Sequence, residues 1–260
     1  MNILTFKFIS MAVIVAAGIA GGIISRRVII SKQKEKLFSV GNAFAGGIFL
    51  GASLLHMIPD ARHGFIAFIP EYDFPWAAFL CACGFVMVLF LQRVLLYGDK
   101  AVRNSEMKKP GRTFSPHIFT LSLCIHSIIV GIALGTEYVL SKAVVILIAI
   151  ITYKLSATFA LEVSMHRAGI KGDLQKKISV IFCSMTPLGI LFGVTLTAFL
   201  QGKAEQILTS AFDALAAGTF LYLALIDIIE EEFIKFEYKW LKFGLLLFGL
   251  ALMTVIAIWT

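Results

Sequence analysis

The chain has 260 residues, of which 59% are hydrophobic and only 15% are charged, whereas soluble globular domains carry about 25% charged residues. This composition excludes an ordinary soluble protein. The formal net charge is +7, but the basic residues lie between apolar segments and are not interleaved with aromatic residues, so the sequence does not predict nucleic-acid binding. We therefore expect an integral membrane protein whose surroundings are lipid.

Eight apolar segments follow one another along the chain, and each is long enough to cross a membrane as an α-helix, which takes about 20 residues. The expected helices lie near residues 3–25, 37–59, 74–97, 114–136, 140–164, 178–200, 207–229 and 241–259. The first segment is longer than the apolar core of a typical signal peptide, so we expect it to be retained. The predicted fold class is all-α, with eight transmembrane helices in a single membrane domain.

Basic residues are unevenly distributed between the two sides of the predicted membrane domain. Eighteen of them lie in the connections that follow the first, third, fifth and seventh helices. The other side holds four, namely Lys7, Arg62, Lys142 and Lys203. Because basic residues collect in cytoplasmic loops, both termini are expected to be extracytoplasmic.

The longest of these connections, residues 98–113, is polar and contains Pro110 and Gly111, which are typical loop residues. We expect it to be a cytoplasmic linker. It would join residues 1–97, with the first three helices, to residues 114–260, with the remaining five.

Few ionisable residues lie inside the apolar segments, where each is costly unless it is paired or hydrated. The fourth segment carries His126 and Ser127, and the fifth carries Tyr153 and Lys154 at nearly the same depth. A short connection makes these helices antiparallel neighbours, so the two pairs are expected to face each other. Two interpretations stay open: a site for a cation, or a structural cluster in which hydroxyl groups bind Lys154 and His126 stays neutral.

Further polar residues mark the ends of two helices. His56 and Asp60 share a face at the outer end of the second helix, and Asp227 and Glu231 share one at the inner end of the seventh. Each pair either attracts cations or forms solvated surface. With the central residues they would line a cation path, and a mixture of imidazole, carboxylate and hydroxyl groups suits zinc, iron(II) or manganese better than calcium.

Four sequence blocks resemble the ZIP family of divalent-metal transporters. They are Asn42 to Leu50 with His56 to Ala61, His126–Ser127 with Gly131 to Gly135, Thr186 to Ile190, and Ala216 to Tyr222. The resemblance implies a ZIP-like bundle in which the fourth and fifth helices, within residues 114–260, carry the metal site and slide as a unit. It also implies uptake of a divalent metal towards the cytosol.

The resemblance implies a role for each candidate residue. The metal site would hold His126 as principal ligand with Ser127, Tyr153 and Thr186 near it, Lys154 as a fixed charge in place of a second metal, His56 and Asp60 at the entrance, and Asp227 and Glu231 at the exit. The chain departs from the family at Val130, where a bridging Glu is typical, at Tyr153, where His is usual, and at Ala157, a carboxylate in other members. We therefore expect a weak site or one of altered selectivity.

The predicted function is transport of zinc, or of iron(II) or manganese, as substrate, with no cofactor and no enzymatic activity. One alternative is a ZIP homologue that has lost transport and acts as a structural or regulatory partner, which Val130 favours. Another is an intramembrane metalloenzyme, although catalytic zinc normally keeps three protein ligands and His126 is one. The expected location is a plasma membrane or a bacterial inner membrane, and the small-residue faces suit either internal packing or a homodimer.

Overall fold

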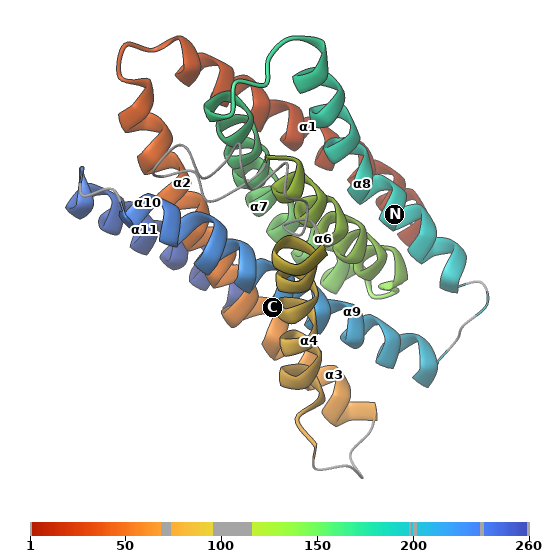
Figure 1. Cartoon of the computed structure of the whole chain (residues 1–260). Coiled ribbons are helices and arrows are strands. Elements are labelled where there is room, and N and C mark those ends of the chain that lie inside the picture. Colours follow the sequence, from red (N-terminus) through yellow and green to blue (C-terminus); the bar gives the residue numbers. More distant parts are fainter. Residues whose placement is uncertain are drawn as a thin grey trace.

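The computed structural model describes residues 2–68, 74–95, 116–197, 199, 202–234 and 237–258, and these residues form a bundle of helices with no strand among them (Figure 1). The helical elements are α1 (Ile3–Ile30), α2 (Lys34–Gly51), η1 (Ala52–Met57), α3 (Ile58–Phe68), α4 (Trp76–Phe90), η2 (Leu91–Leu95), α6 (Pro116–Thr136), α7 (Leu140–Arg167), α8 (Asp173–Thr197), α9 (Lys203–Tyr222), η3 (Leu223–Ile229), α10 (Glu230–Ile234) and α11 (Lys239–Ala257).

Within these described residues, eight helices are long and apolar enough to cross a membrane, which confirms the predicted fold class. The π-helical segments η1 and η3 join their neighbours into two continuous spans, Lys34–Ala67 and Gln206–Ile234. Several helices run past the expected ends; α7 continues to Arg167 and the second span to Ala67. A run of apolar residues indicates only the part of a helix that lies in hydrocarbon, so a polar extension of that helix is not predicted from the run. The predicted linker, residues 98–113, lies outside the described residues.

Glycine-mediated contacts bring α6 and α8 together. A Cβ atom on Gly131 would lie 2.9 Å from Cα of Gly189, and one on Gly135 would lie 2.9 Å from Cα of Gly193. Either would also meet a backbone carbonyl of α8. Only glycine permits so close an approach, so the Gly-x-x-x-Gly pair of α6 serves packing inside the bundle.

The second Gly-x-x-x-Gly pair is also used internally. Gly47 meets the backbone of α11 at Leu246, and Gly51 packs against the Cβ atom of Met253 on the same helix. Neither pair therefore offers a free face for a second copy of the chain.

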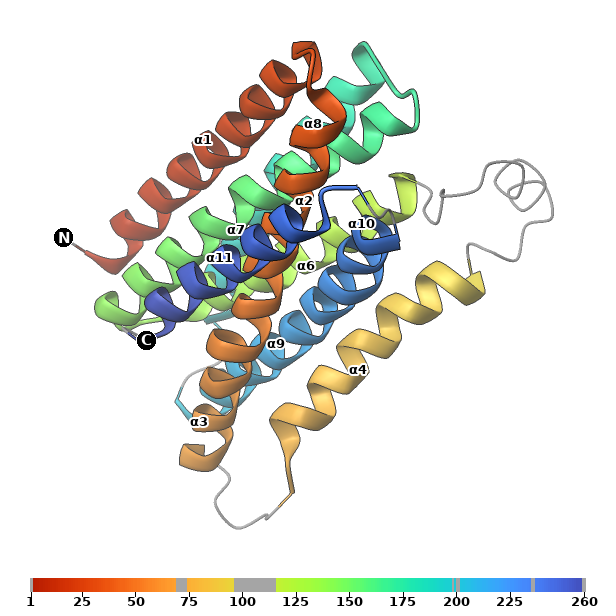
Figure 2. The same cartoon turned by 90° about the vertical axis from the view of Figure 1, so that its left-hand side faces the viewer.

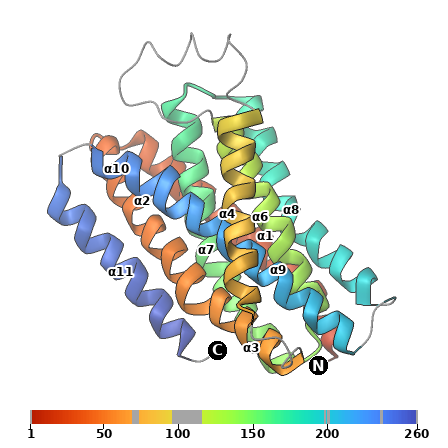
Figure 3. The ribbon, with the colours of Figure 1, turned by 60° about the horizontal axis from the view of Figure 1, so that its bottom comes forward.

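Both described ends of the chain lie at the same end of the bundle (Figures 2 and 3). Near the N-terminus, the buried Lys7 donates a 2.5 Å hydrogen bond from Nζ to the backbone carbonyl of Gly135. This contact ties the beginning of α1 to the end of α6. Lys7 was counted above as a basic residue of the outer side, and it lies inside a helix at that end.

We expect epitope tags at the N- and C-termini to be labelled from outside intact cells, because the charge distribution places that end of the bundle outside. A tag inserted between residues 98 and 113 should be labelled only after permeabilisation. A tag in the turn at Gly169–Gly172, which joins α7 to α8, serves as the matched cytoplasmic control. Labelling of the terminal tags only after permeabilisation would reverse the orientation.

Candidate metal path

His126 lies at the centre of the bundle, 2% exposed, with its ring stacked on Phe220 of α9 at 3.3 Å between centroids. Its Nδ1 lies 2.8 Å from Oγ1 of Thr219 and 3.2 Å from the carbonyl of Ala216. The Thr219 hydroxyl donates to that same carbonyl at 2.7 Å, so it accepts from Nδ1–H of the imidazole. The neutral ring then carries its lone pair on Nε2, which is buried without a hydrogen-bond partner.

Tyr153 of α7 faces His126, as the antiparallel arrangement predicted. The two rings meet edge to face at 5.7 Å between centroids, and Tyr153 also packs edge-on against Phe220 at 4.8 Å. The Tyr153 hydroxyl is buried without a partner, as Nε2 of His126 is. Leaving a buried polar group unsatisfied costs about 1–3 kcal/mol, so this pair of open atoms marks a place where a ligand would be stabilised.

Lys154, the next residue on α7, has three hydrogen-bond acceptors for its ammonium group. Its Nζ donates to the carbonyl of Phe182 at 2.9 Å and lies 3.6 Å from the centroid of the Phe182 ring. It also donates to the hydroxyls of Thr186 at 3.2 Å and Ser127 at 3.3 Å. Ser127 and Thr186 thus turn towards the ammonium group, whereas His126 and Tyr153 do not contact it.

The end of the bundle at which both described chain ends lie (Figure 3) is hollowed by a cavity of about 590 Å³. Its acidic, basic and histidine lining residues are His56, Asp60, His63, Glu137, Lys142 and Asp213. A smaller pocket of about 20 Å³ continues inward from His56, Asp60 and Asp213 and ends at Val130 and Tyr153. In the predicted entrance pair, Nδ1 of His56 lies 2.9 Å from Oδ2 of Asp60. Both residues line a space that reaches Tyr153, whose ring contacts that of His126.

Sequence reasoning missed Asp213 in this cavity. Asp213 of α9 lines the cavity together with His56 of η1, Asp60 of α3 and Glu137, which directly follows α6. The sequence does indicate this residue, because an Asp inside an apolar span is a candidate for a functional site.

Asp227, one of the two predicted exit residues, is 3% exposed on the other side of the centre. Its Oδ2 accepts a 2.9 Å hydrogen bond from Nε2 of Gln92, and its Oδ1 is buried without a partner. Gln92 in turn accepts a hydrogen bond from the Tyr222 hydroxyl at 3.1 Å. One carboxylate oxygen of Asp227 is thus positioned and the other is open.

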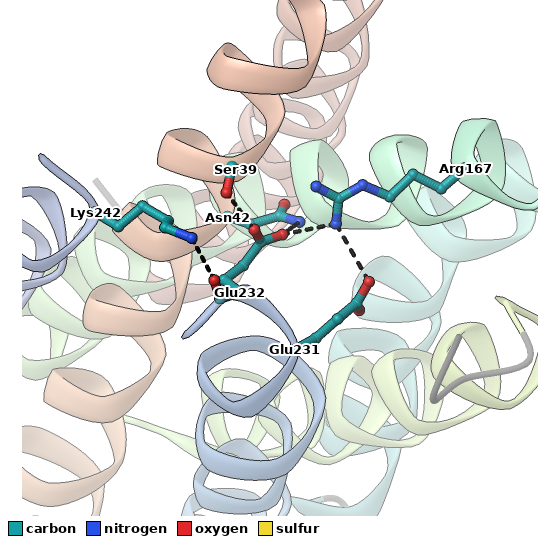
Figure 4. Close-up of polar contacts among 6 residues, drawn as sticks. All are labelled: Ser39, Asn42, Arg167, Glu231, Glu232 and Lys242. Atoms are coloured by element: carbon teal, nitrogen blue, oxygen red, sulfur yellow. Dashed lines mark hydrogen bonds and ion pairs between the residues drawn. The ribbon is translucent and has the colours of Figure 1, made fainter. Parts of the chain in front are cut away.

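The second predicted exit residue, Glu231, is half-buried and lies 3.3 Å from Nη1 of Arg167 (Figure 4). The more deeply buried carboxylate belongs to Glu232, which sequence reasoning did not single out. The four-residue spacing from Asp227 assumed an α-helix, but Asp227 lies in the π-helical segment η3. A π-helix has more residues per turn, so the buried face advances by one position to Glu232.

In the part of the chain that the structure describes, no group of three or more His, Cys, Asp or Glu residues is close enough together to hold a metal ion. The central pair offers one imidazole nitrogen and one phenol oxygen. Tight zinc sites use four good ligands, so this arrangement suits an ion that binds weakly and moves on.

We expect Thr219→Val to weaken zinc binding about tenfold, because an orienting partner of a metal-binding imidazole typically contributes a factor of 10–100. The effect should be at the low end because the Ala216 carbonyl remains in reach of Nδ1. Calorimetric titration of the purified protein measures it. Thr254→Val, which removes an exposed hydroxyl on α11, is the matched control, and an unchanged affinity in Thr219→Val would contradict the assigned tautomer.

The chain matches the family model described as ZIP Zinc transporter over residues 3–118 and 103–257. It is 27% identical to zinc transporter ZIP1 of Homo sapiens over 261 residues, which cover 86% of this chain and 79% of that protein. It is 28% identical to zinc transporter ZIP1 of Danio rerio over 258 residues, 85% of each chain. It is also 23% identical to zinc transporter 11 of Arabidopsis thaliana over 88% of this chain and 78% of that protein. This multi-pass membrane protein therefore belongs to the ZIP zinc transporter family.

Proposed function

We propose that this chain carries a divalent metal ion, zinc foremost with iron(II) and manganese as further candidates, from the extracytoplasmic side towards the cytosol. The observation that carries the proposal is the pair of open atoms, Nε2 of His126 and the Tyr153 hydroxyl. Tyr153 lines the pocket that continues the outer cavity, and its ring contacts that of His126. Membership of the family and the names of the relatives agree with metal transport.

The first step is capture in the outer cavity. Asp60, Asp213 and Glu137 place three acidic side chains in this cavity against one basic side chain, that of Lys142, so acidic groups predominate in its lining. Charges of one sign in a cleft of low dielectric raise the local concentration of the opposite ion. A hydrated cation would collect there, and His56 and Asp60 would guide it into the narrow pocket.

The second step is passage through the central pair. His126 would supply the nitrogen ligand and Tyr153 a weaker oxygen ligand, with water completing the coordination. Lys154, held by Ser127 and Thr186, would keep a positive charge beside the ion. That charge would disfavour a second ion and limit the residence of the first, because a transported ion must bind weakly enough to leave.

The last step leads past the open oxygen of Asp227 to Glu231 near the cytoplasmic end. Since Asp227 is positioned by Gln92, its free oxygen can receive an ion without a change of side-chain conformation. We propose these two residues as the exit.

A transport-inactive homologue is the second candidate, and Val130 favours it. This apolar side chain lines the narrow pocket where family members typically carry Glu. An intramembrane metalloenzyme finds less support, because among the described residues His126 does not belong to any group of three His, Cys, Asp or Glu residues that could hold a catalytic metal ion.

We expect His126→Ala to lower zinc uptake into proteoliposomes at least tenfold, since it removes the nitrogen ligand of the path, and Tyr153→Phe to lower it less. His117→Ala, an exposed histidine of the same helix, is the matched control. Uptake by His126→Ala equal to that of the wild type would contradict the proposed path. If only Val130→Glu transports, the wild-type chain is an inactive homologue.

We expect Asp213→Asn to raise KM for zinc about threefold to tenfold while leaving the maximal rate nearly unchanged, because the carboxylate acts in capture. Initial uptake rates over a range of zinc concentrations separate the two parameters. Asp173→Asn, an exposed residue at the other end of the bundle, is the matched control. An unchanged KM in Asp213→Asn would exclude Asp213 from the entrance.

A further inference from the structure

At the cytoplasmic end of the proposed path, Arg167 reaches from the last turn of α7 to α10. Its Nη1 lies 2.7 Å from Oε1 of Glu232 and 3.3 Å from Oε1 of Glu231 (Figure 4). The side chain of Glu232 is 1% exposed and that of Arg167 is 17% exposed. This guanidinium group therefore binds two carboxylates in a largely dehydrated place, where an ion pair is screened little by salt.

The carboxylate of Glu232 is also held independently of Arg167. Ser39 donates to its Oε2 at 2.5 Å and Asn42 donates to its Oε1 at 2.8 Å, both from α2. Lys242 of α11 donates to the backbone carbonyl of Glu232 at 2.5 Å. If Arg167 moved away, Glu232 would keep these partners and its position, so the ion pair could break and form again without disturbing α2, α10 and α11.

The polar contacts of α7 point in two directions near its end. Five residues before Arg167, the buried Glu162 accepts hydrogen bonds from Gln175 and Ser179 of α8, both at 2.5 Å. These contacts tie α7 to α8, whereas Arg167 ties it to α10. Arg167 is thus a charged link across an interface that α7 could open while it stays attached to α8.

Apolar contacts fill the same interface beside the ion pair. Phe38 of α2 and Phe159 and Val163 of α7 form a small core of their own, and Phe159 lies against Gly41, where a Cβ atom would overlap its ring. Val163 is completely buried there, four residues from Arg167. Close packing and an ion pair together shut this end of the path, while the opposite end holds the open cavity.

We propose that Arg167 is a latch that holds the cytoplasmic end closed by occupying the carboxylates of Glu231 and Glu232, and that a metal ion leaves only after the guanidinium group withdraws. The proposal rests on the proposed transport function. Because α7 also carries Tyr153, about 20 Å away along the helix axis, the latch would couple the exit to the central pair. A divalent cation that arrives at the exit competes with Arg167 for the same oxygens and so favours its release.

Thiol labelling tests the latch without measuring transport. In full-length protein whose four cysteines are replaced by alanine, Ser141→Cys reports on the outer cavity, which it lines, and Val163→Cys reports on the buried interface. Adding Arg167→Met should raise the rate at which a maleimide labels position 163 from the cytoplasmic side roughly tenfold and lower labelling at position 141. Lys176→Met, which breaks an exposed ion pair within α8, should change neither rate.

A milder variant guards against misfolding of Arg167→Met. Glu231→Gln keeps Glu232 and its partners and should raise labelling at position 163 by a smaller factor. Unchanged labelling in both variants, with the protein still monodisperse in detergent, would overturn the latch. If labelling shifts as expected but the wild-type chain carries no zinc, the latch stands and the proposed transport fails, so the two claims are tested separately.

A reversible cross-link holds the contact between α7 and α10 closed, whereas the preceding variants weaken it. In the same cysteine-free background, Arg167→Cys combined with Glu231→Cys and joined by a short bis-methanethiosulfonate should take up zinc more slowly into proteoliposomes than the same variant before cross-linking. A reducing agent should restore the rate of the variant that was not cross-linked. Cross-linked protein that transports at the rate of the reduced protein would show that this end need not open, which also overturns the proposal.

Discussion

Hydrocarbon offers no hydrogen-bond partner, so each polar group inside a membrane protein must find one within the protein. Three buried lysines obey this constraint by donating to backbone carbonyls: Lys7 to Gly135, Lys154 to Phe182 and Lys242 to Glu232. The open atoms of His126, Tyr153 and Asp227 are among the buried side-chain atoms of the described residues that lack a hydrogen-bond partner. These three belong to the proposed path, in which a passing metal ion would be the partner of each in turn.

The eight membrane spans could be predicted from the sequence, because the thickness of the membrane sets the length and hydropathy that a spanning helix needs. The sequence was also sufficient for the meeting of His126 and Tyr153, since a short connection forces α6 and α7 to run antiparallel. One of the two interpretations of the central residues predicted that hydroxyl groups bind Lys154, and Ser127 and Thr186 do so. The Phe182 carbonyl could not be derived, because it comes from α8, whose approach depends on glycine contacts with α6. Lys242 is one of the eighteen basic residues assigned to the connections, yet it is fully buried in the first turn of α11.

Two carboxylates of the site were not predicted from the sequence, and the reason differs between them. Asp213 was visible as an ionisable residue in an apolar span, and only its neighbours across the cavity show its use. Glu232 was concealed by helix geometry, because an α-helical spacing from Asp227 selects Glu231, whereas the π-helical segment η3 turns Glu232 inward. The run of acidic residues does not reveal whether Glu231 or Glu232 faces inward, because packing decides where a π-helical segment forms.

The proposed path is open towards one side, narrow at His126 and Tyr153, and closed at Arg167, with a central site too poor in ligands to retain an ion. It requires above all that the ion binds Nε2 of His126. X-ray absorption at the zinc edge, on purified protein loaded with less than one equivalent of zinc, tests this directly. The account predicts oxygen ligands together with an imidazole signal that disappears in His126→Ala; the same imidazole signal in that variant would contradict it.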